Sequence, residues 1–120
     1  MRITIPQTQH YAYADVVVVC GPPQLDDDFK DNLLNPTVII EVLSPATERY
    51  DRGKKFESYQ RIASLMEYVL VSQDIPRVEQ FLRQLDGHWL YSETSGDGII
   101  KLASIECQLS FKDIFAKVEF

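Results

Sequence analysis

Two apolar segments, residues 14–20 and 37–43, each carry one acidic residue, and together they limit the possible folds more than any other feature. Both segments predict β-strands because they are rich in Val and Ile, which fit a pleated and buried surface. Their apolar residues follow one another without alternation, which is typical of strands in a sheet covered on both faces. We therefore expect a central β-sheet with a layer on each side.

A helix is expected between two strands of this sheet. The periodicity of the apolar residues predicts a helix over residues 48–62, and residues 67–72 predict the strand that follows it. Passage from strand 37–43 through this helix to the next strand implies a right-handed crossover between parallel strands. With further short strands at residues 2–5 and 99–102, the expected class is α/β (mixed α+β) with a mixed sheet.

The C-terminal half predicts a β-hairpin and a short terminal helix. Residues 77–84 and 88–95 flank Asp86–Gly87, a dipeptide that is a strong signal for a tight turn. Ser110, followed by Asp113, resembles a helix N-terminal capping box, so a short helix is expected there. The expected order is three strands, a helix, a strand, the hairpin and the terminal helix.

Size and composition indicate one globular domain over residues 1–120. Hydrophobic residues make up 45% of the chain and charged residues 25%, which excludes a disordered chain. No apolar run is long enough to span a membrane, and the N-terminal residues do not resemble a signal peptide. Cys20 and Cys107 are too few for a disulfide framework or a zinc site, so free thiols and a cytoplasmic location are expected.

The net charge of −6 limits the expected partners. A strong, sequence-independent grip on nucleic acid needs Lys and Arg to displace the counterions of the phosphates, and the acidic total argues against it. A nuclease is not excluded, because divalent metals offset carboxylates at a phosphate site. A local basic patch can also persist on an acidic protein.

The acid within each apolar strand needs a chemical explanation. Asp15 precedes four consecutive valines, and Glu41 lies between Ile40 and Val42. Burial of an isolated carboxylate is unfavourable, so each acid needs a cationic partner, a metal or a raised pKa. Separate ion pairs with Arg or Lys are one explanation. The other explanation, which requires both acids to point the same way, is a shared divalent cation. Mg²⁺ suits such oxygen ligands.

The predicted helix supplies a third candidate. With Arg52 as the reference and about 100° per residue, Lys55 falls at the edge of the inward face that carries Tyr59, whereas Lys54 points to solvent. Lys55 can therefore reach the sheet beside the acids. A surface ion pair with Asp51, four residues earlier, explains the spacing equally well. Tyr59 is expected to be a core tyrosine whose hydroxyl lies at the edge of the hydrophobic core.

These residues occur in motifs that together resemble one bacterial family. The motifs are Asp15, then Glu41–Pro45, then Asp51–Lys55 with Tyr59, and then Glu67–Val71. They resemble the restriction-endonuclease-like proteins called domain of unknown function 820, within the PD-(D/E)XK nuclease superfamily. The resemblance covers essentially the whole chain and implies a restriction-endonuclease-like central mixed β-sheet.

The resemblance also implies which residues are catalytic. Asp15 matches the first acid of the family, although Ala14 replaces the usual proline before it, and Glu41 matches the second acid. Leu43 stands where the superfamily has its lysine. In this family that lysine lies on the following helix, where Lys55 is the matching position. The implied catalytic residues are therefore Asp15, Glu41 and Lys55.

The implied activity is that of a metal-dependent endonuclease that hydrolyses DNA phosphodiester bonds. Asp15, Glu41 and the backbone carbonyl of Val42 would hold Mg²⁺ or Mn²⁺. Lys55 would orient or deprotonate the water, or stabilise the developing negative charge. The implied supporting residues are Tyr59 and Asp51.

Family members usually carry an N-terminal region before the Asp15 strand, with a helix beside the site that adds another acid. This chain begins at its first predicted core strand, so we expect either a natural truncation or a partner chain that supplies this layer. The sheet face left exposed would favour a homodimer. Two alternatives are a catalytically inactive subunit acting in oligomerisation or binding, and a metal-dependent phosphohydrolase acting on something other than DNA.

Overall fold

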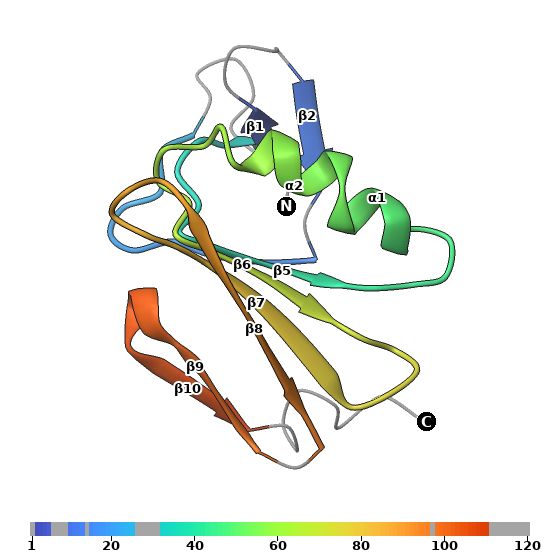
Figure 1. Cartoon of the computed structure of the whole chain (residues 1–120). Helices are drawn as coiled ribbons and strands as arrows, with labels where there is room; N and C mark the ends of the chain where they lie inside the picture. The colour runs from blue at the N-terminus through green and yellow to red at the C-terminus, as the bar shows by residue number, and fades with distance from the viewer. Residues whose placement is uncertain (1, 6–9, 14, 26–31, 97, 111–120) are drawn as a thin grey trace.

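A mixed five-stranded β-sheet is the centre of the computed structural model, which describes residues 2–5, 10–13, 15–25, 32–96 and 98–110. Two short helices lie on one face of this sheet and a two-stranded hairpin lies on the other (Figure 1). The strand order is β3-β5-β6-β7-β8, so the expected mixed α/β class is confirmed. The strands are β3 (Val16–Val18), β5 (Val38–Val42), β6 (Glu67–Val71), β7 (Arg77–Arg83) and β8 (Trp89–Ser95).

Strands β5 and β6 are the parallel pair that the sequence predicts. In their register, Glu41 lies beside Leu70 and Val42 lies beside Val71. The other three neighbouring pairs of this sheet are antiparallel. The helical segment connects β5 to β6 across one face, as a crossover connection requires.

The helical segment differs from the single helix expected over residues 48–62. It consists of α1 (Glu48–Arg52) and α2 (Lys54–Tyr59), which Gly53 separates. A Cβ atom at Gly53 would lie 3.2 Å from the carbonyl oxygen of Arg49, so this tight joint favours glycine. Because the helix is interrupted, one helical wheel does not describe both parts.

Strand β3 corrects the expectation of an interior strand covered on both faces. It is only three residues long, lies at the edge of the sheet and pairs with β5 alone among the described strands. Val16 is 47% exposed. The expectation is right for β5, where Val38 and Ile39 point to opposite faces and are both fully buried. An apolar run alone therefore does not distinguish an edge strand from an interior one.

A hydrophobic core fills the space between the sheet and the helices. Aromatic rings are its largest members, and the Phe56 ring stacks on Tyr68 with centroids 4.9 Å apart. Glu41 lies on this same face of β5, because Ile39 and Leu43, which alternate with it, belong to this core. The buried members are Ile3, Ile39, Leu43, Phe56, Tyr59, Ile62, Leu65, Tyr68 and Leu70.

The opposite face of the sheet is covered by the hairpin of β9 (Ile99–Leu102) and β10 (Cys107–Ser110), joined by the short 3-10 helix η1 (Ala103–Ile105). Glu67 is buried on this face and accepts hydrogen bonds from the backbone N–H and the hydroxyl of Ser104. This carboxylate is therefore satisfied by the fold itself, and it ties the hairpin to β6.

A small second sheet has the order β2-β1-β4, with β1 at Arg2–Ile5, β2 at His10–Tyr13 and β4 at Asn32–Leu33. The strand expected at residues 2–5 is confirmed, whereas β2, β4 and β10 were not expected. Beyond Ser110, which ends β10, the predicted terminal helix lies outside the described residues.

The predicted hairpin of β7 and β8 is confirmed, and Gly87 in its turn adopts a positive φ of 89°. Both Cys20 and Cys107 are free, as expected. Within the described part of the chain, no helix has the length and apolar character needed to cross a membrane.

Candidate active site

Asp15 stands immediately before β3 and is exposed. Its Oδ2 atom accepts a hydrogen bond of 2.7 Å from the backbone N–H of Val42. This N–H lies beyond the last strand pair that joins β3 to β5, Val16 with Ile40, so the carboxylate satisfies a donor at the sheet edge. The other oxygen, Oδ1, has no hydrogen bond to any residue that the structure describes.

Glu41 is 2% exposed and points toward the helices. Its Oε1 atom accepts a hydrogen bond from the Tyr59 hydroxyl at 3.3 Å and lies 3.0 Å from Lys55 Nζ. Burial raises the pKa of Glu41 to about 7, while the hydrogen bond and the positive charge of Lys55 act in the opposite direction. The nearby negative charges of Asp15 and Asp51 raise this pKa further. The surroundings of Glu41 therefore favour an additional cation.

Lys55 combines the two arrangements that the sequence left open. Its ammonium reaches the sheet at Glu41, and it also lies 3.6 Å from Asp51 Oδ1, one helical turn earlier. All three side chains are almost fully buried. The neighbouring Lys54 is exposed, as predicted. The orientation expected for Lys54 and Lys55 is thus confirmed, although the helix is broken just before them.

A cavity of about 310 Å³ brings these groups together. The expected site residues that line it are Asp15, Glu41, Val42, Asp51 and Lys55, with Tyr59 behind Glu41.

The lining residues that sequence reasoning missed are Ser44, Thr47 and Tyr50. Tyr50 was missed because a continuous helix would place it on the outer side. Its position directly before Asp51 is the one signal that could have identified it.

The two acids expected to share a metal do line one cavity. Among the residues that the structure describes, no group of three or more His, Cys, Asp or Glu side chains is arranged to hold a metal ion. Of the three carboxylates among the described lining residues, Asp51 is paired with Lys55, and Asp15 and Glu41 are the two proposed to hold a metal. Val42 contributes its N–H to Asp15, and metal binding through its carbonyl stays a prediction.

Helix α1 is held in place by contacts to two strands. The Tyr68 hydroxyl on β6 donates a buried hydrogen bond of 2.8 Å to the backbone carbonyl of Asp51. Arg52 donates to Glu79 on β7 at 2.9 Å, and Tyr91 donates to the same carboxylate at 2.8 Å. Burial raises the pKa of Glu79, but the hydrogen bonds from Arg52 and Tyr91 outweigh it and lower this pKa below its usual value. These contacts fix the backbone that presents Asp51 to Lys55.

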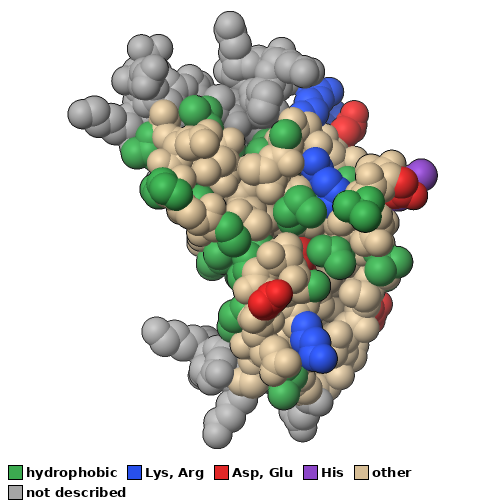
Figure 2. Space-filling model, turned by 90° about the vertical axis from the view of Figure 1, so that its left-hand side faces the viewer, with side chains coloured by type: hydrophobic (Ala, Val, Ile, Leu, Met, Phe, Trp, Pro, Cys, Tyr) green, Lys and Arg blue, Asp and Glu red, His purple; other side chains and the backbone are tan. Residues whose placement is uncertain are grey.

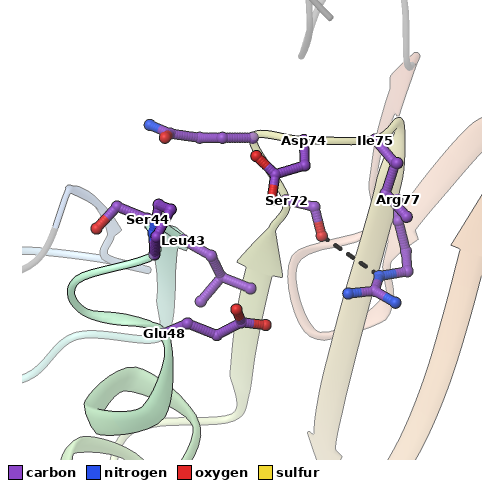
Figure 3. Close-up of a pocket in the computed structure, with 9 residues that line it drawn as sticks. Leu43, Ser44, Glu48, Ser72, Asp74, Ile75 and Arg77 are labelled. Carbon is purple, nitrogen blue, oxygen red and sulfur yellow. Dashed lines mark hydrogen bonds between the residues drawn. The ribbon is translucent and has the colours of Figure 1, made fainter.

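A second cavity, of about 290 Å³, lies at the C-terminal ends of β5 and β6 and shares Ser44 with the first (Figure 3). Within it, Arg77 donates a hydrogen bond from Nε to the Ser72 hydroxyl at 3.3 Å. The side chains of Glu48 and Asp74 also point into this space. The open surface beside the candidate site therefore continues past Ser44 toward Arg77.

Two cyanobacterial proteins resemble the chain along almost its whole length. The uncharacterized protein sll1609 of Synechocystis sp. is 34% identical over 114 residues, which are 95% of this chain and 61% of that protein. The uncharacterized protein slr1290 of the same organism is 33% identical over 120 residues, which are 100% of this chain and 62% of that protein. The chain thus spans about three fifths of the length of these relatives.

The fold is similar to that of a protein from Anabaena variabilis whose crystal structure is described as that of "a putative nuclease belonging to DUF820". The TM-score is 0.70 at 20% sequence identity, and the similarity covers 96% of this chain and 64% of that chain. At this identity the similarity establishes the fold, so the expected restriction-endonuclease-like sheet is confirmed.

The family model Uma2, described as "Putative restriction endonuclease", matches residues 1–112. The match covers almost the entire chain. The chain therefore belongs to the Uma2 (DUF820) family of restriction-endonuclease-like proteins.

Proposed function

We propose that this chain hydrolyses phosphodiester bonds in DNA with the help of a divalent cation, Mg²⁺ or Mn²⁺. The observation that carries the proposal is the convergence of Asp15, Glu41 and Lys55, from three separate segments of the chain, on one cavity. Two carboxylates and an amine are the groups that metal-assisted phosphodiester hydrolysis uses. Membership of a restriction-endonuclease-like family supports the same chemistry.

The donor set of the cavity suits a hard divalent cation. Mg²⁺ prefers oxygen ligands and is commonly bound by one or two carboxylates, with water and substrate phosphates as its other ligands. Within the described ranges, the hydrogen bonds to these carboxylates go to Asp15 Oδ2 and Glu41 Oε1, so Asp15 Oδ1 and Glu41 Oε2 can accept a cation. The carbonyl of Val42 is a further ligand in this proposal. When bound, the cation would relieve charge on the phosphate and make a coordinated water more acidic.

Lys55 is the side chain that would act on the reacting atoms. In the hydrolysis, the oxygen of an attacking water forms a new bond to phosphorus while the bond to the leaving ester oxygen breaks. The proton that the water loses replaces the broken bond on the leaving oxygen. The Lys55 ammonium, which lines the cavity, can donate a hydrogen bond to a non-bridging phosphate oxygen and stabilise its negative charge. Asp51 and Tyr59 would hold Lys55 and Glu41 in this arrangement.

Metal binding and DNA cleavage test the proposal separately. We expect isothermal titration calorimetry to detect Mg²⁺ or Mn²⁺ binding to the wild type and to find it lost in Glu41→Gln, which keeps the shape of the side chain. Plasmid nicking should be lost in the same variant and kept in Lys54→Ala, whose side chain is exposed. Intact plasmid with both metals, together with no metal binding by the wild type, would contradict the proposal. Metal binding with hydrolysis of a simple phosphate ester but not of plasmid would indicate a different phosphohydrolase.

A catalytically inactive subunit that oligomerises or binds a partner is the second candidate function. The net charge of −6 and the incomplete set of metal ligands in the described residues favour it. Figure 2 shows hydrophobic side chains gathered around a hollow on one side of the molecule, where a second copy of the chain could pack. A homodimer in sedimentation experiments, without metal binding or nuclease activity, would support this function. A monomer that binds Mg²⁺ and nicks plasmid would contradict it.

A further inference from the structure

Tyr50 presents an exposed aromatic ring at the cavity that Glu41 and Lys55 line. Tyr50 is 52% exposed, although its aromatic ring is large and mostly apolar. The centroid of the ring lies 6.0 Å from Lys55 Nζ, the atom expected to contact the phosphate. The ring is therefore close to the proposed reaction centre and open to a bound molecule.

Among the residues that the structure describes, few contacts involve the Tyr50 side chain. Tyr59, Tyr68 and Tyr91 each donate a hydrogen bond from the hydroxyl to a neighbouring residue. For Tyr50, the described residues provide no hydrogen-bond partner and no stacked ring. Only the ammonium of Lys55 lies near its face. The contacts within the described part of the chain therefore do not account for an aromatic residue at this position.

The backbone that carries Tyr50 is nevertheless held firmly. The next residue, Asp51, accepts a buried hydrogen bond at its carbonyl from Tyr68. The residue after that, Arg52, lies 2.6 Å from a carboxylate oxygen of Glu79. The ring thus projects from a fixed part of α1, and a ligand that stacks on it would not have to order the backbone.

Attraction to phosphate alone is weak at this cavity. Asp15, Glu41 and Asp51 place three carboxylates on its walls, and among the described lining residues Lys55 is the one cationic side chain. A bound divalent cation would offset part of this negative charge. Further affinity has to come from contacts that do not depend on phosphate charge. Stacking of a base on an aromatic side chain is such a contact, and it tolerates any base sequence.

We propose that Tyr50 stacks on a nucleobase beside the scissile phosphate, so that the substrate is single-stranded or locally unpaired DNA. In a continuous duplex each base is covered on both faces by its neighbours, so only an unstacked base can meet the ring. This inference rests on the proposed nuclease function. It goes further by naming the structural class of DNA and the residue that selects it.

Binding and cleavage of matched oligonucleotides test the inference. A fluorescein-labelled strand is compared alone and in a blunt duplex, by fluorescence anisotropy with Ca²⁺ and by steady-state cleavage with Mg²⁺. The variants are Tyr50→Ala and Tyr50→Phe, and the control is Leu90→Ala. Leu90 is 58% exposed on β8, away from the cavity and on the other face of the sheet.

We expect the wild type to prefer the single strand. Tyr50→Ala should weaken its binding and raise KM roughly 5- to 150-fold, the range expected for one lost base stack, with a much smaller change in kcat. Tyr50→Phe, which keeps the ring, should restore wild-type behaviour, and Leu90→Ala should not differ from the wild type.

Two results would overturn the inference. If the duplex is cleaved as well as the single strand and Tyr50→Ala behaves as the wild type, the stacking role fails while the nuclease function stands. If neither form of DNA is bound or cleaved although Mg²⁺ binds, the nuclease function fails and the inference fails with it.

Discussion

The backbone N–H of Val42 donates a 2.7 Å hydrogen bond to the carboxylate of Asp15, 27 positions earlier in the chain. This contact joins the start of the edge strand β3 to β5 directly beside Glu41. Asp15 therefore has a structural contact through one oxygen and a proposed ligand role through the other. Substitutions that keep or remove the acceptor can separate these two roles.

Asp15→Asn should keep the structure and lose metal binding. The amide still offers an oxygen to the Val42 N–H, so the free energy of unfolding should stay within about 0.5 kcal/mol of the wild type. Asp15→Ala removes the acceptor and should lower this free energy by about 1 kcal/mol. Urea denaturation measures both changes, and calorimetry with Mg²⁺ measures the lost binding. Equal Mg²⁺ affinity in Asp15→Asn and the wild type would contradict the ligand role.

The titration of Glu41 should make stability depend on pH in a defined direction. Burial raises its pKa to about 7, whereas the unfolded chain releases the same proton near pH 4.5. Between these values the folded protein holds one more proton than the unfolded chain, so its free energy of unfolding falls as the pH rises. The contribution of Glu41 to this fall is of the order of 3 kcal/mol.

Urea denaturation at several pH values between these limits measures this effect. Glu41→Gln carries no titrating group at this position, so the loss of stability with rising pH should be smaller than in the wild type. The difference between the two proteins isolates Glu41 from the other titrating groups. Parallel pH profiles for the two proteins would show that the Glu41 carboxyl titrates at its ordinary pKa.

Lys55 and Lys54 form a matched pair of adjacent lysines with opposite surroundings. Lys55→Ala leaves Glu41 and Asp51 buried without their ammonium and should lower the free energy of unfolding by roughly 3 kcal/mol. Lys54→Ala should change it by less than about 0.5 kcal/mol.

Plasmid nicking by the same variants tests the catalytic role. It should be abolished in Lys55→Ala and unchanged in Lys54→Ala. Lys55→Met fills more of the space and serves as the test of activity if the alanine variant does not fold. Equal loss of activity in the Lys54 and Lys55 variants would contradict the orientation of α2 in the proposed mechanism.

Tyr68→Phe tests the anchor of helix α1. It removes the hydroxyl that donates to the carbonyl of Asp51, in a buried setting, and should lower the free energy of unfolding by about 1–3 kcal/mol. Tyr50→Phe is the matched control, because that tyrosine is exposed, and it should change stability by less than about 0.5 kcal/mol. Thermal unfolding followed by circular dichroism compares the two variants. Similar melting temperatures for both would show that the Asp51 carbonyl does not depend on Tyr68.

Much of the fold follows from local patterns in the sequence. The strands β5 and β6, the helical crossover between them and the turn at Asp86–Gly87 depend on residues that are close together in the chain. The short strands β2, β4 and β10 could not be predicted in the same way. Two to four residues carry little periodicity, and these strands exist because a partner strand supplies their hydrogen bonds.

For Glu41, Lys54 and Lys55, the sequence alone determined which side of its own element each side chain occupies. Alternation along β5 places Glu41 with Ile39 and Leu43, and helical periodicity separates Lys55 from Lys54. Only the tertiary structure decided that Asp15 reaches β5 from an edge strand and that Tyr50 lines the same cavity. Local periodicity fixes directions within an element. Distances between elements arise from strand pairing and from the break at Gly53, which connect residues that no local pattern relates.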